Sequence, residues 1–212
     1  NINIQEMNAT LIAAKAASNL PVICQKTKAE DGRTITGTPP KAAAILLDSM
    51  GADIIGANCS LGPDKLFNVA KEMIAATNKP IIIQPNAGMP VLENGETLFP
   101  LSAEDFARET AKFADIGVSY LGGCCGTTPE HLHALIKELE NKPTVTPPKV
   151  KPFTALTCRT GVVYVGDNYA PVKIGERINP TGRKTLREDI QKGSFVSIKK
   201  ERLAEVAAGP DI

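Results

Sequence analysis

The sequence is poor in aromatic residues and contains no tryptophan, since phenylalanine and tyrosine together make up 4% of its 212 residues. It also lacks an excess of one charge, because 24 lysines and arginines face 23 acids, which leaves a net charge of +1 at pH 7. Basic and acidic residues are interleaved, so a nucleic-acid surface is not expected. No apolar run is long enough to cross a bilayer, so no membrane partner is expected either.

Cysteine is sparse, with five residues and none of the density of a secreted disulfide scaffold. A metal site or a reactive thiol is the better interpretation, and Cys24 and Cys158 are the two that we expect to be structural. No signal peptide is visible at the start, and the expected compartment is the cytoplasm. The chain begins with Asn1 rather than Met, so we expect a fragment of a longer protein.

Short apolar runs alternate with amphipathic stretches through residues 1–140. The expected strands are 21–25, 53–58, 80–84 and 118–121, and the expected helices are 7–18, 39–50, 63–76, 103–116 and 129–140. Strand-then-helix units at a pitch of roughly thirty residues predict an α/β fold with a parallel sheet. A complete (β/α)8 TIM barrel needs about 250 residues. We therefore expect residues 1–140 to form the second half of such a barrel.

A doubly wound sheet is the alternative architecture for the same alternation. It is disfavoured because no Gly-x-Gly-x-x-Gly turn follows any of the expected strands. The loop between the third strand and its helix, which contains Asn94 and Gly95, is expected to be long. Ser102 and Asp105 then predict a capped helix start.

Residues 141–170 differ in composition, with several prolines among lysines and threonines, and are predicted to be a semi-rigid interdomain linker. Residues 162–165 and 172–175 are strand-like, and two helices are expected within 186–192 and 197–208. Residues 171–212 are too few to make a domain of their own.

Four polar or sulfur-bearing residues fall just beyond the ends of expected strands. Cys59 follows the second strand, Asn86 the third, and Cys124 and Cys125 the fourth. In a barrel these strand ends converge on the catalytic face. Three thiolates suit zinc, and a catalytic zinc keeps its fourth position open. Such a zinc keeps a substrate thiol deprotonated near neutral pH, which is chemistry for alkylating sulfur. Asn86 is a candidate oxygen ligand or substrate contact.

Other interpretations of the adjacent cysteines stay open. Cys124 and Cys125 could form a strained vicinal disulfide, pack as small buried residues, or act as a switch in a non-catalytic zinc or redox module. His131 and His133 lie two apart in an expected helix, so they face different ways and are not expected to share a metal.

Three motifs carry a resemblance to a known family. They are GANCSLGP at 56–63, QPNAG at 84–88 and GGCCGTTP at 122–129. In this order they resemble the homocysteine-binding barrel of the zinc-dependent homocysteine S-methyltransferases, over most of residues 1–140. The resemblance implies a methyltransferase that binds homocysteine, with Cys59, Cys124 and Cys125 as zinc ligands and Asn86 in the site.

A second resemblance lies beyond the expected linker. GERINPTG at 175–182 is similar to the opening strand of the pterin-binding barrel that follows the homocysteine barrel in cobalamin-dependent methionine synthases. It implies that residues 171–212 begin a second TIM-type barrel. It also implies that a methyl group passes from 5-methyltetrahydrofolate to cobalamin and then to homocysteine. Glu176, Asn179 and Arg183 would lie near the pterin.

The resemblance also implies that some modules of the complete enzyme are absent from this chain. Cobalamin would be bound by modules absent here, so the cobalamin-binding domain of the same protein is an expected partner and the fragment alone is expected to be incomplete. The sibling alternative is a single-barrel homocysteine S-methyltransferase that takes methyl groups from betaine or S-methylmethionine. Such an enzyme would not continue into a strand like that of residues 175–182.

Overall fold

The computed structural model describes residues 3–212, which fold as two compact units. The first holds the residues up to 152 together with 157–162, and the second holds 153–156 and 163–212. These units are defined by packing contacts within the chain. The domain boundaries predicted at residues 140 and 170 rest on sequence motifs instead, and they stay a prediction.

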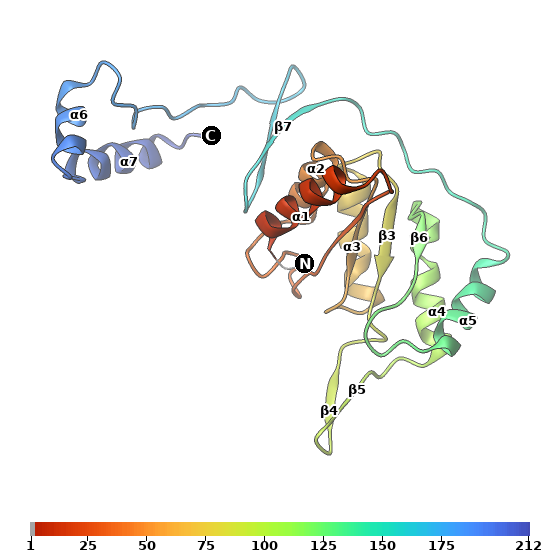
Figure 1. The fold of residues 1–212 in the computed structure, drawn as a ribbon. Helices are drawn as coiled ribbons and strands as arrows, with labels where there is room; N and C mark the ends of the chain where they lie inside the picture. Colours follow the sequence, from red (N-terminus) through yellow and green to blue (C-terminus); the bar gives the residue numbers. More distant parts are fainter. Residues whose placement is uncertain (1–2) are drawn as a thin grey trace. The chain divides into compact units, whose positions relative to one another are not determined.

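A parallel sheet with the strand order β1-β2-β3-β6 forms the centre of the first unit (Figure 1). Its strands are β1 (Ile23–Lys26), β2 (Ile54–Asn58), β3 (Ile81–Gln84) and β6 (Tyr120–Leu121). The helices are α1 (Ile4–Ala17), α2 (Pro40–Ser49), α3 (Pro63–Ile74), α4 (Ala103–Ala111), the short 3-10 helix η1 (Ala114–Ile116) and α5 (Pro129–Leu139). The predicted α/β fold with a parallel sheet is confirmed.

The two faces of this sheet have different surroundings. Successive strand residues point to opposite faces, and four positions on the helix-covered face are at most 2% exposed: Ile55, Ala57, Ile81 and Ile83. On the other face Ile23 is 49% and Tyr120 is 48% exposed. The second face is open to solvent, although parallel sheets are usually covered on both sides.

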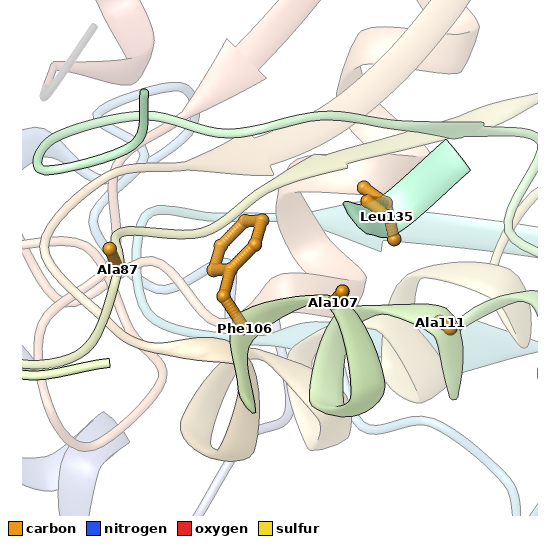
Figure 2. Close-up of a cluster of buried hydrophobic side chains, with 5 residues drawn as sticks. All are labelled: Ala87, Phe106, Ala107, Ala111 and Leu135. Atoms are coloured by element: carbon orange, nitrogen blue, oxygen red, sulfur yellow. The ribbon is translucent and has the colours of Figure 1, made fainter. Parts of the chain in front are cut away.

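A small apolar cluster fixes the loop that follows β3 (Figure 2). Phe106 and Ala107 on α4 and Leu135 on α5 are at most 3% exposed, and Ala87 of the loop is fully buried against them. The ring of His131 meets Phe106 edge to face, with ring centroids 5.5 Å apart. Burying these side chains therefore holds α4, α5 and the loop after β3 in one arrangement.

The long loop after β3 contains a hairpin that the sequence analysis missed. Its strands are β4 (Val91–Glu93) and β5 (Glu96–Leu98), and Figure 1 shows them projecting beyond the sheet. Asn94 and Gly95 take positive φ values of 52° and 82°, which an Asn-Gly hairpin turn requires. The connection is long, as expected, and the hairpin within it was not predicted because the strand pattern of an exposed ribbon is weak.

The second unit contains most of β7 (Thr154–Thr157) and β8 (Val162–Val165), which pair with each other, together with α6 (Lys184–Gln191) and α7 (Val196–Ala208). The strand expected at 172–175 is absent, and that prediction was wrong. Backbone hydrogen bonds instead join Lys173 and Gly175 to Asp211 and Ile212. These bonds do not make a regular pair of strands. Within residues 3–212, no helix is long and apolar enough to cross a membrane.

Candidate metal centre

The thiols of Cys59, Cys124 and Cys125 meet at one edge of the sheet. Their sulfur atoms all lie within 4.8 Å of one another, at 3.4 Å between Cys59 and Cys125 and 4.0 Å between Cys124 and Cys125. Because β2 and β6 are parallel members of one sheet, the loops beyond their carboxyl ends open on the same side. The structure therefore brings the adjacent Cys124 and Cys125 to Cys59, which lies 66 residues before Cys125 in the sequence.

The backbone at Cys59 has an unusual conformation. Cys59 and Ser60 have φ values of 65° and 62°, in the left-handed region that residues with a Cβ rarely adopt. The Cys59 N–H donates to the carbonyl of Gln84 at 3.1 Å, and the Leu61 N–H donates to the Cys59 carbonyl at 2.8 Å. Backbone strain of this kind clusters at functional sites, where the surroundings hold it in place.

Backbone hydrogen bonds join the double-cysteine loop to the loop after β3. The Cys124 N–H donates to the carbonyl of Pro85 at 2.8 Å, and the Ala87 N–H donates to the carbonyl of Cys125 at 2.9 Å. Gly126 has φ +77°, and a Cβ there would lie 2.2 Å from Cγ of Phe99. Only glycine allows both this turn and this close approach.

Asn86 lies between the two loops with 3% of its surface exposed. Its Oδ1 accepts a hydrogen bond from the backbone N–H of Cys125 at 3.2 Å. Asn86 therefore supports the loop that carries two of the thiols. Its predicted role as an oxygen ligand or substrate contact stays a prediction.

Asn58 is a residue of the site that the sequence analysis did not select. Its Nδ2 donates to Sγ of Cys124 at 3.8 Å. The available signal was its position, since Asn58 is the last residue of β2 and directly precedes Cys59. Two-residue alternation along the strand puts its side chain on the open face, together with that of its β3 partner Gln84.

His131 has a structural role. Its Nδ1 accepts from the backbone N–H of Thr128 at 3.3 Å, and its Nε2 lies 3.1 Å from the carbonyl of Leu101. The thiol cluster found among the described residues includes neither His131 nor His133.

The thiols of Cys59 and Cys125 hold their protons to different degrees. Burial favours a raised pKa at Cys59, but hydrogen bonds from the thiols of Cys125 and Cys124 and from the Ser60 N–H outweigh it and lower the pKa below its usual value. The hydrogen bond to Cys59, together with burial, raises the pKa of Cys125 to about 11. All three sulfurs can therefore be anionic at neutral pH only if a cation compensates their charge.

The remaining cysteines lie outside the cluster. Cys24 is 6% exposed on the helix-covered face of β1, where burial raises its pKa. Cys158 is exposed, and a hydrogen bond with the hydroxyl of Thr160 lowers its pKa.

The residues expected near a pterin lie in the second unit. Asn179 donates to the carboxylate of Glu176. Arg183 donates to the carbonyl of Arg177 and forms an ion pair with Glu201. The structure places Glu176 beside Asn179 and pairs Arg183 with Glu201 of α7. The assignment of all three residues to a pterin site stays a prediction.

A parallel βα sheet with three thiols converging beyond its strand ends defines an α/β protein with a thiol cluster that could hold a metal ion. Residues 2–139 match the family model described as homocysteine S-methyltransferase. The chain belongs to the homocysteine S-methyltransferase family.

Similar sequences include the methionine synthases of two mycobacteria. The chain is 32% identical to that of Mycobacterium tuberculosis (strain ATCC 25618 / H37Rv) over 181 residues and 30% identical to that of Mycobacterium leprae (strain TN) over 179 residues. Each alignment covers 82% of this chain but 15% of the relative. The chain thus spans a small part of the length of these relatives.

Among solved structures, the fold is similar to that of the homocysteine methyltransferase MmuM from Escherichia coli. The apo form gives a TM-score of 0.52 at 21% identity, covering 64% of this chain and 46% of MmuM. The metallated form gives 0.51 at 22% identity, covering 63% and 41%. At these identities the likeness is one of fold.

Proposed function

We propose that this chain carries the zinc centre of a methionine synthase, at which a methyl group is transferred to the sulfur of homocysteine to give methionine. The observation that carries the proposal is the convergence of Cys59, Cys124 and Cys125, with all sulfur atoms within 4.8 Å of one another. Family membership supports homocysteine as the thiol substrate.

The donor set fits zinc in number and spacing. Tetrahedral zinc with Zn–S bonds of about 2.3 Å separates its sulfur ligands by roughly 3.8 Å. The sulfur separations of 3.4 Å and 4.0 Å bracket that value. Three protein thiolates leave one of four positions for a substrate atom, as in catalytic rather than structural zinc sites.

The chain's own residues prepare this site. A zinc ion bound there would supply the positive charge that keeps a substrate thiol deprotonated near neutral pH. Asn58 donates to the Cys124 sulfur, and Asn86 holds the backbone of Cys125. Cys125 is exposed, so the cluster can be reached by a small thiol.

The proposal extends to the whole protein. A methyl group would come from 5-methyltetrahydrofolate by way of cobalamin, with the pterin near Glu176, Asn179 and Arg183. Residues 171–212 would begin a second TIM-type barrel after the linker 141–170, and residues 1–140 would be the second half of the homocysteine barrel. Cobalamin would be bound by another domain, and the protein would be cytoplasmic.

The extent of the similarity supports a methionine synthase over a single-barrel enzyme. The family model ends at residue 139. The alignments with the two methionine synthases cover 179 and 181 residues, so they continue beyond that point. A single homocysteine barrel gives no reason for similarity in this region.

Metal analysis and proton release test the proposal. The reduced protein should contain about one zinc per chain by mass spectrometry of metals, and homocysteine should release about one proton per site. Homoserine, which carries a hydroxyl in place of the thiol, is the control and should release none. A folded chain without zinc, or a zinc centre indifferent to homocysteine, would contradict the proposal and favour a structural or redox role for the thiols.

A further inference from the structure

A site that transfers a methyl group to a substrate thiolate must avoid methylating its own thiolate ligands. Each cysteine sulfur beside the substrate is a competing nucleophile for the methyl group. The three thiols of this cluster differ in the hydrogen bonds that they receive, and the inference drawn from this difference rests on the proposed function.

One sulfur of the cluster accepts a hydrogen bond from an N–H group. The side-chain amide of Asn58 donates to Cys124 with Nδ2 and Sγ 3.8 Å apart. The donor stands at the end of β2.

The sulfur of Cys125 is bonded differently. Among the described residues, its hydrogen bonds are shared with the thiols of Cys59 and Cys124, and Cys125 is exposed. Its backbone N–H is directed to Asn86 rather than to its own sulfur. Cys125 therefore lacks the N–H donor that Cys124 has, and it is the thiol most open to solvent.

We propose that Asn58 is a positioning residue that keeps Cys124 from being methylated. A hydrogen bond to a thiolate draws charge from the sulfur, and part of that stabilisation is lost when the sulfur becomes a thioether. Cys124 is thereby a poorer nucleophile than a substrate thiolate that has no such donor. Cys125 is the protein thiol that remains open to alkylation.

Methyl iodide gives a direct test. The zinc-loaded protein is treated with limiting reagent and digested, and methylation at each cysteine is measured by mass spectrometry. In each event a cysteine sulfur forms a bond to the methyl carbon as the carbon–iodine bond breaks, and iodide leaves with the bonding electrons. Cys125 should be methylated first, ahead of Cys124 and Cys59. Equal methylation of all three would overturn the proposal.

Substitution of Asn58 separates hydrogen bonding from exposure. Asn58→Leu removes the donor at similar volume, and Asn58→Asp removes it with the same shape. Either change should raise methylation of Cys124 by roughly fivefold or more, since a hydrogen bond to a charged group is lost, and should leave Cys59 unchanged. A general loosening of the site would raise both. An unchanged Cys124 in a folded, zinc-loaded variant contradicts the proposal.

Asn78→Leu is the matched control, because Asn78 donates its side-chain amide to the carbonyl of Val150 rather than to a thiol. It should keep the wild-type methylation pattern. Adding homocysteine to the same reaction reports on the proposed function separately. If no methionine forms but the cysteines are methylated in the expected order, only the methyltransferase proposal fails. If methionine forms but the cysteines are not methylated in that order, only the proposed role of Asn58 fails.

Discussion

The side-chain oxygen of Asn86 accepts a hydrogen bond from the backbone N–H of Cys125 at 3.2 Å, and this bond joins the loop after β3 to the loop after β6. The carbonyl of Cys125 in turn accepts from the N–H of Ala87, the residue next to Asn86. Ala87 is buried against Phe106. The position of the exposed thiol thus depends on a buried amide and on an apolar cluster.

Replacing Asn86 by Leu should weaken both the fold and the metal centre. The Cys125 N–H, whose hydrogen bond is partly buried, would lose its acceptor, which costs about 1 kcal/mol of unfolding free energy. Zinc affinity should fall roughly 10- to 100-fold, as for other residues that support metal ligands. Asn86→Asp keeps an acceptor oxygen and is the control. Chelator competition and urea unfolding measure the two effects, and a Leu variant with wild-type zinc affinity would contradict this role.

Replacing Cys124 by Ala should abolish stoichiometric zinc binding, because two thiols cannot supply the three-sulfur set of the proposed site. Cys158→Ala removes an exposed thiol outside the cluster and should keep the full zinc content. Metal analysis of both purified variants makes the comparison. Homocysteine-dependent methylation at the wild-type rate by the complete protein carrying Cys124→Ala would refute the ligand assignment.

Alanine substitutions at two glycines separate the energetic cost of backbone strain from that of a steric clash. Gly126 and Gly95 have φ values of +77° and +82°, but a Cβ would meet Phe99 only at Gly126. Gly95→Ala should cost about 1 kcal/mol for the left-handed backbone, whereas Gly126→Ala should cost roughly 3 kcal/mol or more because Phe99 or the loop must move. Urea unfolding measures both. Equal costs would show that the loop relaxes freely around the added methyl group.

Two lysines of the first unit are buried without a partner. Lys26 and Lys28 are 0% and 1% exposed, and neither Nζ atom has a hydrogen-bond partner within the described part of the chain. Burial lowers the pKa of each to about 8. The neighbouring charges that modify this effect are Glu6 for Lys26, and Lys26, Glu72, Asp31 and Arg33 for Lys28.

This burial predicts a pH-dependent stability. Because the folded pKa of about 8 lies below the unfolded value of 10.5, the unfolded state binds more protons between these values and the unfolding free energy rises with pH there. Lys28→Met should therefore be more stable than wild type at pH 7, by on the order of 1–3 kcal/mol, and lose that advantage near pH 11. Lys41→Met at an exposed position is the control. An advantage independent of pH would exclude a buried charge as its cause.

The sequence by itself determined the order of strands and helices and the strand ends at which the thiols stand. Alternating apolar runs and amphipathic stretches are local patterns, and the parallel βα arrangement follows from them because short connections leave few other topologies. Cys59, Cys124 and Cys125 could be selected for this reason, before any distance between them was known. The Asn94-Gly95 hairpin was also within reach of local reasoning.

Only the tertiary structure decided how the site is supported. The bond from Asn58 to Cys124 and that from Cys125 to Asn86 join residues 66 and 39 positions apart, and no local pattern specifies such pairs. The left-handed backbone at Cys59 and the burial of Lys26 and Lys28 likewise contradict local preference. Such conformations persist only where contacts from distant parts of the chain compensate their cost, and those contacts exist only in the folded molecule.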